Sequence, residues 1–141
     1  MTRRHKARRG VLQILYAWEA RARDRPLEEE AADFWARRKV MSGAREYAER
    51  LVTALAEHLD EIDVLLGETS EGWEVERMSI VDRNILRIAV AEFLYVDDVP
   101  SKVSIDEAVM LASRYGGADS PRFVNGILDA IAHKLNLIAG R

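Results

Sequence analysis

The sequence lacks cysteine entirely, and its 141 residues include only three histidines and three prolines. Without cysteine the chain cannot form disulfides, bind a metal through thiolates or use a cysteine nucleophile. The histidines, His5, His58 and His133, lie far apart and form no His-x-x-x-His pair, so their spacing indicates no zinc site. These absences exclude several enzyme classes, and we predict a protein without a metal or a cofactor.

Long hydrophobic runs are also missing. No apolar stretch approaches the roughly 20 residues of a membrane-spanning helix, and the basic N-terminus lacks the apolar segment of a signal peptide. We therefore expect a cytoplasmic protein with no membrane partner. No Ser/His/Asp arrangement stands out, and the Gly116-Gly117 doublet follows a helical pattern rather than a strand, so it lacks the context of a phosphate-binding loop. The sequence thus predicts a protein that is not an enzyme.

What the sequence does contain is a helical apolar pattern. Apolar residues make up 48% and charged residues 32% of the chain, which is typical of a globular protein, and the length favours one domain over residues 1–141. Apolar positions recur at spacings of three and four residues, and no segment shows the alternation of a half-buried strand. We predict an all-α fold.

Capping residues, prolines and glycines delimit three main helices in the first half of the chain. The apolar stripe of the first extends to Ala22, and the second starts near Pro26. The third has Ser42 as its N-cap, carries His58 in its buried stripe and ends at Gly67. Three cationic residues complement the dipole at the end of the second helix: Arg37, Arg38 and Lys39.

Three further helices are predicted in the second half. The segment 80–95 is apolar on nearly every side, so it belongs in the middle of a bundle. The sequence SIDE at 104–107 is a capping box that starts the next helix. Ser120 caps the last helix, with Pro121 at its first position.

Charge is segregated in a way that indicates a partner. The formal net charge is −3, yet five cationic side chains fall within residues 1–9. On a helical wheel Lys6, Arg9, Gln13 and Tyr16 share the side opposite the apolar stripe. Cations meet phosphates, glutamine can bond base edges and tyrosine can stack on an unpaired base, which favours single-stranded RNA. A basic helix end with one stray aromatic residue is the alternative interpretation.

A second candidate is the segment GGADSPRFVNGILD, residues 116–129. A capped helix N-terminus there offers backbone N–H groups and a positive dipole beside Arg122, so an anion could dock. Phe123 lies at the edge of the buried stripe. It is either half exposed and able to stack, or part of the core.

These stretches together resemble a known family. An arginine-rich opening helix ending in LQILYAWE is followed by VDRNILRIAVAEFLY, DVPSKVSIDEAVMLASRYGG and DSPRFVNGILD, and the chain is similar over nearly its whole length to the NusB family of bacterial transcription antitermination factors. The resemblance implies a bundle of six to seven helices in two small subdomains. It also implies binding of single-stranded boxA RNA together with ribosomal protein NusE, in a complex with other antitermination factors and RNA polymerase.

The resemblance assigns residues to these roles. The first helix and the start of the last helix would contribute to one RNA surface, which with Gln13 consists of Arg3, Arg4, Lys6, Arg8, Arg9, Tyr16, Arg122, Phe123 and Asn125. Asp119 and Ser120 would cap the last helix or organise its loop, since a carboxylate repels phosphate. Asp82 would lie near NusE, and an equal alternative is that it closes a capping box with Ser79.

Two other functions compete with this interpretation. The first is a helical protein that forms homo-oligomers, such as a homodimer, in which the basic helix packs on an acidic face of another copy. The second is an RNA-binding module related to RNA methyltransferases, in which NusB-like domains occur. The length of the chain argues against the second, because nothing in it could bind the methyl donor.

Overall fold

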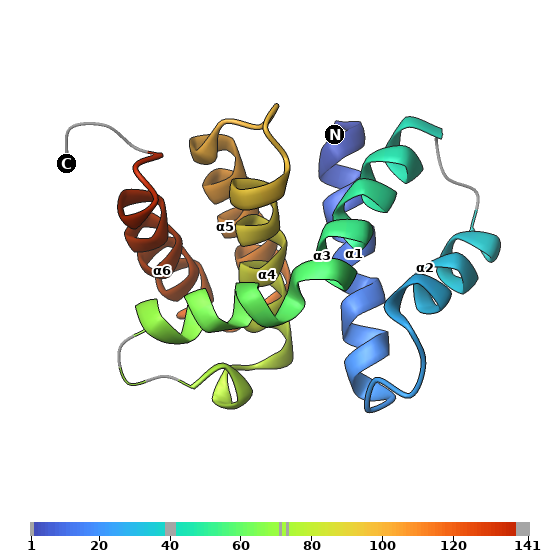
Figure 1. Cartoon of the computed structure of the whole chain (residues 1–141), viewed down its shortest axis with the longest axis horizontal. Helices are drawn as coiled ribbons and strands as arrows, with labels where there is room; N and C mark the ends of the chain where they lie inside the picture. The colour runs from blue at the N-terminus through green and yellow to red at the C-terminus, as the bar shows by residue number, and fades with distance from the viewer. Residues whose placement is uncertain (1, 39–41, 71, 73, 138–141) are drawn as a thin grey trace. The chain divides into compact units, whose positions relative to one another are not determined.

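The computed structural model describes residues 2–38, 42–70, 72 and 74–137 of the chain. Over these residues it contains six α-helices and one turn of 3-10 helix, with no strand (Figure 1). The chain divides into two compact units, Met1–Glu57 and His58–Arg141. The all-α prediction is confirmed. Within the described part of the chain, no helix combines the length and hydropathy needed to cross a membrane.

In the first unit, α1 (Arg3–Ala20) packs against α2 (Leu27–Ala36) at a glycine. A Cβ added at Gly10 would lie 2.8 Å from Cη2 of Trp35, which is closer than side chains approach one another. Glycine costs about 1 kcal/mol of helix propensity relative to alanine, and in return it admits the indole ring against the helix backbone. Apolar residues of α1 and of the first part of α3 complete this core: Val11, Ile14, Leu15, Leu51 and Leu55.

Helix α1 ends two residues before the predicted end of its apolar stripe. Ala22 and Arg23 adopt left-handed backbone conformations, with φ of 56° and 55°, and turn the chain toward α2. The indole Nε1–H of Trp18 donates a 2.7 Å hydrogen bond to the carbonyl oxygen of Arg25, which ties this turn to α1. Ala22 therefore lies in the connection and not on the helix, because tertiary hydrogen bonding ends the helix before its apolar pattern does.

Helix α3 (Ser42–Thr69) differs from the prediction in two ways. It continues through Gly67, because the hydroxyl groups of Thr69 and Ser70 bond to the carbonyl oxygens of the preceding turn. It is also kinked at His58, whose φ of −127° and ψ of 19° are not helical. The His58 ring is half buried and stacks on Tyr95 at 3.9 Å between centroids, so it is not the core residue that the periodicity predicts.

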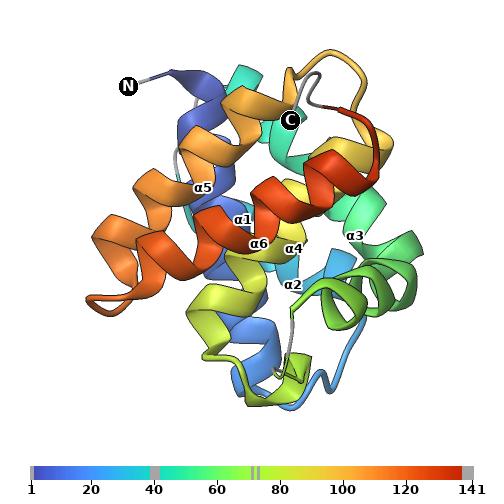
Figure 2. The ribbon, with the colours of Figure 1, turned by 90° about the vertical axis from the view of Figure 1, so that its left-hand side faces the viewer.

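The second unit is built around α4 (Ile80–Tyr95), which packs against both α5 (Ser101–Tyr115) and α6 (Ser120–Lys134) (Figures 1 and 2). A 3-10 turn, η1 (Val75–Arg77), precedes α4. The central position predicted for 80–95 is confirmed, since side chains on several sides of α4 are buried: Ile85, Leu86, Ile88 and Val90.

One buried ion pair joins α4 to α3. Arg87 is 2% exposed, and its Nε and Nη2 each donate a 2.8 Å hydrogen bond to the carboxylate of Asp63. Its Nη1 donates to the side-chain oxygen of Asn84 at 2.9 Å. A guanidinium group in this setting is stable only while its partners remain, since an unpaired buried charge is costly.

The start of α5 corrects the predicted capping box. The helix begins at Ser101, and Ser104 is buried one turn inside it. The carbonyl oxygen of Pro100 accepts hydrogen bonds from the N–H groups of Val103 and Ser104, so proline and not serine precedes the first turn. A pattern of Ser and Glu three residues apart is compatible with a helix interior as well as with its start.

Candidate nucleic-acid interface

The first candidate surface is one side of α1. Gln13 and Tyr16 are exposed, Tyr16 to 49%, and the side chains of Lys6 and Arg9 are partly exposed on the same side of the helix. We call these four residues the α1 face. It offers two cations, an amide and an aromatic ring within three helical turns, which is the chemistry needed to meet phosphates, base edges and base planes.

Two other predicted arginines of α1 point toward α3. The guanidinium groups of Arg4 and Arg8 lie over the ring of Tyr47, at 4.5 and 5.5 Å from its centroid. Arg8 is only 3% exposed, so its expected direct contact with RNA does not fit its position. A guanidinium over an aromatic face is a favourable cation–π arrangement, and burial of Arg8 is therefore accounted for within the unit.

Arg3 is exposed and lies against the start of α3. A Cβ added at Gly43 would be 2.7 Å from Cδ of Arg3, so the glycine leaves space for this side chain. The side chain of Ser42, predicted as the N-cap of this helix, and Lys39, predicted at the end of α2, lie outside the residues whose side chains are described.

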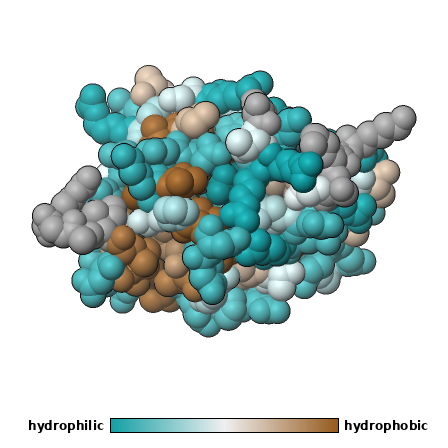
Figure 3. All heavy atoms as spheres, turned by 90° about the horizontal axis from the view of Figure 1, so that it is seen from above, coloured by the Kyte–Doolittle hydropathy of each residue, from teal (hydrophilic) through white to brown (hydrophobic). Residues whose placement is uncertain are grey.

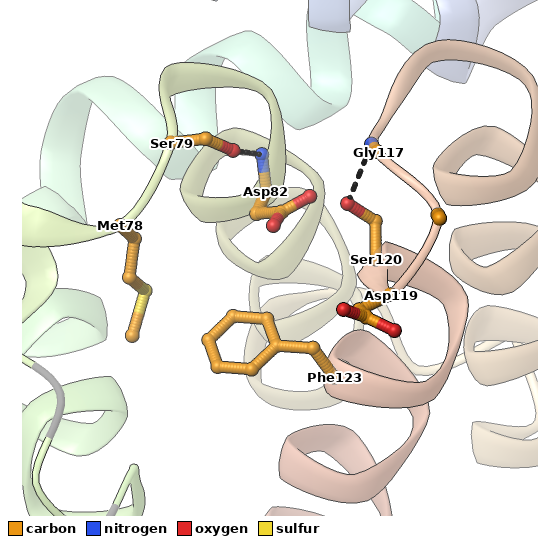
Figure 4. A pocket seen from close by; sticks show the side chains of 8 residues that line it. Met78, Ser79, Asp82, Gly117, Asp119, Ser120 and Phe123 are labelled. Carbon is orange, nitrogen blue, oxygen red and sulfur yellow. Dashed lines mark hydrogen bonds between the residues drawn. The ribbon is translucent and has the colours of Figure 1, made fainter.

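The second candidate surface is a cavity of about 330 Å³ in the second unit (Figure 4). Its lining comes from the start of α4 and from the loop and first turn of α6, and it consists of Met78, Ser79, Asp82, Gly117, Ala118, Asp119, Ser120 and Phe123. In Figure 4 the ring of Phe123 projects into the cavity between the α4 and α6 sides. Phe123 is half buried, which resolves the two alternatives left by the sequence in favour of partial exposure.

The α4 side of this cavity contains an incomplete capping box. The hydroxyl oxygen of Ser79 accepts a 3.0 Å hydrogen bond from the N–H of Asp82, as predicted for a cap. Oδ1 of Asp82, in contrast, is buried and accepts no hydrogen bond from the described residues. Asp82 therefore contributes a partly exposed carboxylate to the lining of the cavity, and one of its two oxygens lacks a donor among the described residues.

The α6 side is organised by Ser120, not by Asp119. The hydroxyl oxygen of Ser120 accepts a 2.9 Å hydrogen bond from the N–H of Gly117, while Asp119 makes no side-chain cap and is exposed. Ser120 is the first residue of the helix and not its N-cap. A Cβ on Gly116 would lie 2.5 Å from the hydroxyl oxygen of Ser120 and 2.9 Å from the carbonyl oxygen of Ala112, so the loop requires glycine there.

The helix start offers fewer anion donors than the motif predicts. The N–H of Ser120 bonds to the carbonyl oxygen of Gly117, and Pro121 has no N–H. Arg122 and Asn125 are both exposed, as their predicted roles require.

Sequence reasoning missed Met78 and Ala118 in the cavity and Tyr47 beneath the arginines. Met78 follows the 3-10 turn, between the predicted end of the third helix and the segment 80–95, and an apolar residue just before Ser79 was its only signal. In the part of the chain that the structure describes, no group of three His, Asp or Glu side chains is placed to hold a metal ion.

The NusB family model matches residues 5–133. The chain therefore belongs to the NusB family. It is 47% identical over 133 residues to the transcription antitermination protein NusB of Salinispora arenicola, with 94% of this chain and 96% of that protein covered. NusB proteins are non-catalytic antitermination factors, so this membership confirms the prediction that the protein is not an enzyme.

Solved NusB structures share the fold. A structure of T. maritima NusB matches with a TM-score of 0.87 at 40% identity, covering 95% of this chain and 92% of that chain. A crystal structure of the antitermination factors NusB and NusE in complex with double-stranded RNA matches with a TM-score of 0.84 at 28% identity, covering 95% and 98%. The NusB-type bundle predicted from the sequence is confirmed.

Proposed function

We propose that this protein is an RNA-binding adaptor in transcription antitermination, which binds single-stranded boxA RNA together with NusE in the cytoplasm. The observation that carries the proposal is the α1 face, where Tyr16 is 49% exposed beside Lys6, Arg9 and Gln13. Tyr16 lies outside the buried stripe of α1, so about half of its surface is available to a ligand beside the two cations. The composition of the α1 face suits a nucleic-acid strand with unpaired bases.

On the first unit, cations hold the backbone of the strand and Tyr16 stacks on a base. Arg3, Lys6 and Arg9 bind phosphates and Gln13 bonds a base edge. Arg4 is partly exposed on the side of α1 that faces Tyr47, and it adds a further phosphate contact from there. Arg8 is excluded from direct contact because it is buried against Tyr47. Its role is to hold α1 on α3.

On the second unit, Phe123 stacks on a base at the mouth of the cavity, with Arg122 on a phosphate and Asn125 on a base edge. Ser120 keeps the loop in place by its bond to Gly117, and Asp119 stays at the rim without touching RNA. The ring of Tyr16 is exposed and that of Phe123 is half buried, so an unpaired base could stack on either ring. This supports recognition of single-stranded RNA rather than a duplex.

NusE is the protein partner in this proposal, and RNA polymerase and other antitermination factors join indirectly. A ribosomal protein is expected to be basic, and Asp82 is a partly exposed carboxylate in the lining of the cavity. A NusE cation would form a charge-assisted hydrogen bond with this carboxylate.

The proposal is tested by fluorescence anisotropy with labelled boxA RNA and a scrambled RNA, with and without NusE. We expect preferential boxA binding that NusE strengthens and that Arg9→Ala/Tyr16→Ala weakens. Arg45→Ala is the control, since Arg45 is an exposed cation of the same unit, paired with Glu49 on α3. Phosphate contacts from Arg3, Arg4, Lys6, Arg9 and Arg122 predict that log affinity falls with log salt at a slope of about −3.5, from roughly −0.7 per contact on a single strand.

Equal and weak binding to both RNAs, with a slope near zero, would overturn the proposal. Self-association is the alternative that this outcome favours. Val103 and Met110 are 42% and 54% exposed on one side of α5, and apolar residues gather in one area of the otherwise mostly hydrophilic surface seen in Figure 3. Sedimentation at low and high salt would then measure whether the protein forms a homodimer.

A further inference from the structure

The two ends of α2 differ in how their arginines are neutralised. At the N-terminal end, Arg21 pairs with Glu30 at 3.9 Å, Arg23 pairs with Glu19 at 3.6 Å, and Arg25 bonds both Glu30 and Asp33. Each of these three arginines is therefore already paired with a carboxylate. Ion-paired arginines of this kind contribute little attraction for a further anion.

At the C-terminal end, Arg37 and Arg38 are exposed and form no ion pair with any described residue. Arg37 also lowers the pKa of Asp33 through its charge, but the hydrogen bond that Arg25 donates to Asp33 is the largest cause of that shift. Arg37 and Arg38 thus place two adjacent guanidinium groups at this end of α2, without ion-pair partners among the described residues. They form a locally positive site, whereas the arginines at the other end of the helix are neutralised.

Arg38 is held in a defined position. Its guanidinium carbon lies 3.7 Å from the centroid of the Phe34 ring, and its Nη1 donates a 3.1 Å hydrogen bond to the carbonyl oxygen of Phe34. A guanidinium stacked on a ring keeps its remaining N–H groups free at the edge of its plane. This geometry suits bidentate contact with the oxygens of a phosphate.

The Phe34 ring connects this site to α1. Phe34 packs edge-on against Trp35, with centroids 4.8 Å apart, and Cε2 of Phe34 would lie 3.5 Å from a Cβ on Gly10. Gly10 is four residues after Lys6 and three before Gln13, so all three share one side of α1. Arg38 is thus separated from the border of the α1 face by a single aromatic ring.

We propose that Arg37 and Arg38, with Phe34 beneath Arg38, form a second phosphate-binding site that extends the RNA path from the α1 face along α2. Its ligand is the phosphodiester backbone of the same single strand. The inference rests on the proposed function, because the strand reaches Arg38 only after it has engaged the α1 face. It adds backbone contacts without base recognition, so it raises the affinity for boxA and scrambled RNA alike.

The test compares Arg37→Gln/Arg38→Gln with Arg21→Gln/Arg23→Gln, which removes the same charge at the other end of α2. Binding of labelled boxA RNA is measured at several salt concentrations, and thermal melting confirms that each variant is folded. With Arg37 and Arg38 added to the five contacts counted above, the wild-type salt slope becomes about −4.9. Loss of these two contacts should lower its magnitude by about 1.4 and weaken binding on the order of tenfold at about 0.1 M salt. The Arg21/Arg23 variant should keep the wild-type slope. Phe34→Leu, which removes the ring but keeps apolar packing, should give a smaller loss.

Wild-type slope and affinity in the Arg37/Arg38 variant would overturn the inference. If Arg9→Ala/Tyr16→Ala still weakens binding in the same assay, the extension alone fails and the proposed function stands. If wild-type protein itself shows no salt-dependent RNA binding, the proposed function fails. Loss of NusE binding or of self-association without loss of RNA affinity would assign the two arginines to a protein contact and also overturn the proposal.

Discussion

The two candidate surfaces are constructed in opposite ways. The α1 face consists of side chains on one continuous helix, all directed outward, and its residues contribute little to the core. The cavity of the second unit is assembled from the start of α4, the loop after α5 and the first turn of α6, held by two serine hydroxyls and a glycine. Variants of the α1 face should therefore change binding alone, whereas variants around the cavity should change binding and stability together.

The largest effect is expected where the framework of the second unit is broken. Asp63→Ala leaves the guanidinium of Arg87, which is 2% exposed, without its carboxylate. We expect the free energy of unfolding to fall by about 3 kcal/mol, measured by urea denaturation. Asp60→Ala, an exposed change on the same helix, should stay within about 0.5 kcal/mol. Equal stabilities of the two variants would contradict the buried ion pair.

A single methyl group should disturb the cavity loop. Gly116→Ala places a Cβ against the hydroxyl of Ser120 and the backbone of α5, so the loop must shift, and we expect a destabilisation of about 2 kcal/mol together with weaker RNA binding. Gly117→Ala is the matched control, because its Cβ would meet nothing closer than 4.0 Å. Thermal melting and anisotropy measure the two effects. Wild-type stability of the Gly116→Ala protein would contradict the expectation that changes around the cavity alter stability as well as binding.

The α1 face should show the reverse behaviour. Tyr16→Leu removes a ring that is 49% exposed, so RNA affinity should fall by about tenfold or 1.4 kcal/mol, within the range for loss of base stacking. The melting temperature should not change measurably. Comparable losses of affinity and stability would show that Tyr16 belongs to the core in solution.

The smallest expected effects are on the pKa values of two carboxyl groups, one in each unit, which are lowered by different interactions. The pKa of Asp33 is lowered by a hydrogen bond from Arg25, whereas the pKa of Glu61 is lowered by hydrogen bonds from Tyr95 and His58. Both groups thus stabilise the folded state above their ordinary pKa, and this contribution is lost as pH falls through the folded pKa. NMR titration should show that 1 M salt raises the pKa of Asp33 more than that of Glu61.

Tyr95→Phe provides the matched check. It should return the pKa of Glu61 toward its ordinary value and leave that of Asp33 unchanged. Tyr95 itself has its pKa raised to about 12 by burial and by Glu61, so its contribution is present below the ordinary tyrosine pKa and is lost as pH rises through about 12. An unchanged Glu61 titration in the variant would contradict the Tyr95–Glu61 hydrogen bond of 2.8 Å.

The difference between the α1 face, which lies on one helix, and the cavity, which is built from several elements, explains which residues the sequence could place. Periodicity placed Lys6, Arg9, Gln13 and Tyr16 on one side of a helix because all four belong to one element. It placed Arg8 on another side of the helix from Arg9, but it could not show that Arg8 is buried beside Tyr47, about 40 positions later in the chain. Burial of a long cationic side chain depends on its tertiary partner and not on its own segment.

Around the cavity the motif predicted Phe123 and Ser120 but misassigned some of the contacts. Asp119 precedes the helix, yet the serine after it makes the stabilising bond, because Gly117 brings its N–H within reach of that hydroxyl. Met78 was missed because it comes from a segment without regular periodicity. Helix boundaries erred for a similar reason, as at Gly67, where side-chain hydroxyls prolong α3 past a residue that usually ends helices.

The packing of Trp35 on Gly10 also restricts how this chain can diverge. Every single-base change of a glycine codon that alters the residue introduces at least a Cβ, and at position 10 that atom would collide with the indole. Replacing Trp35 first, by any smaller residue, leaves a void against α1 whose cost rises with its volume. Neither position can drift alone without passing through a less stable intermediate, so the pair should be inherited as a unit among descendants of this sequence.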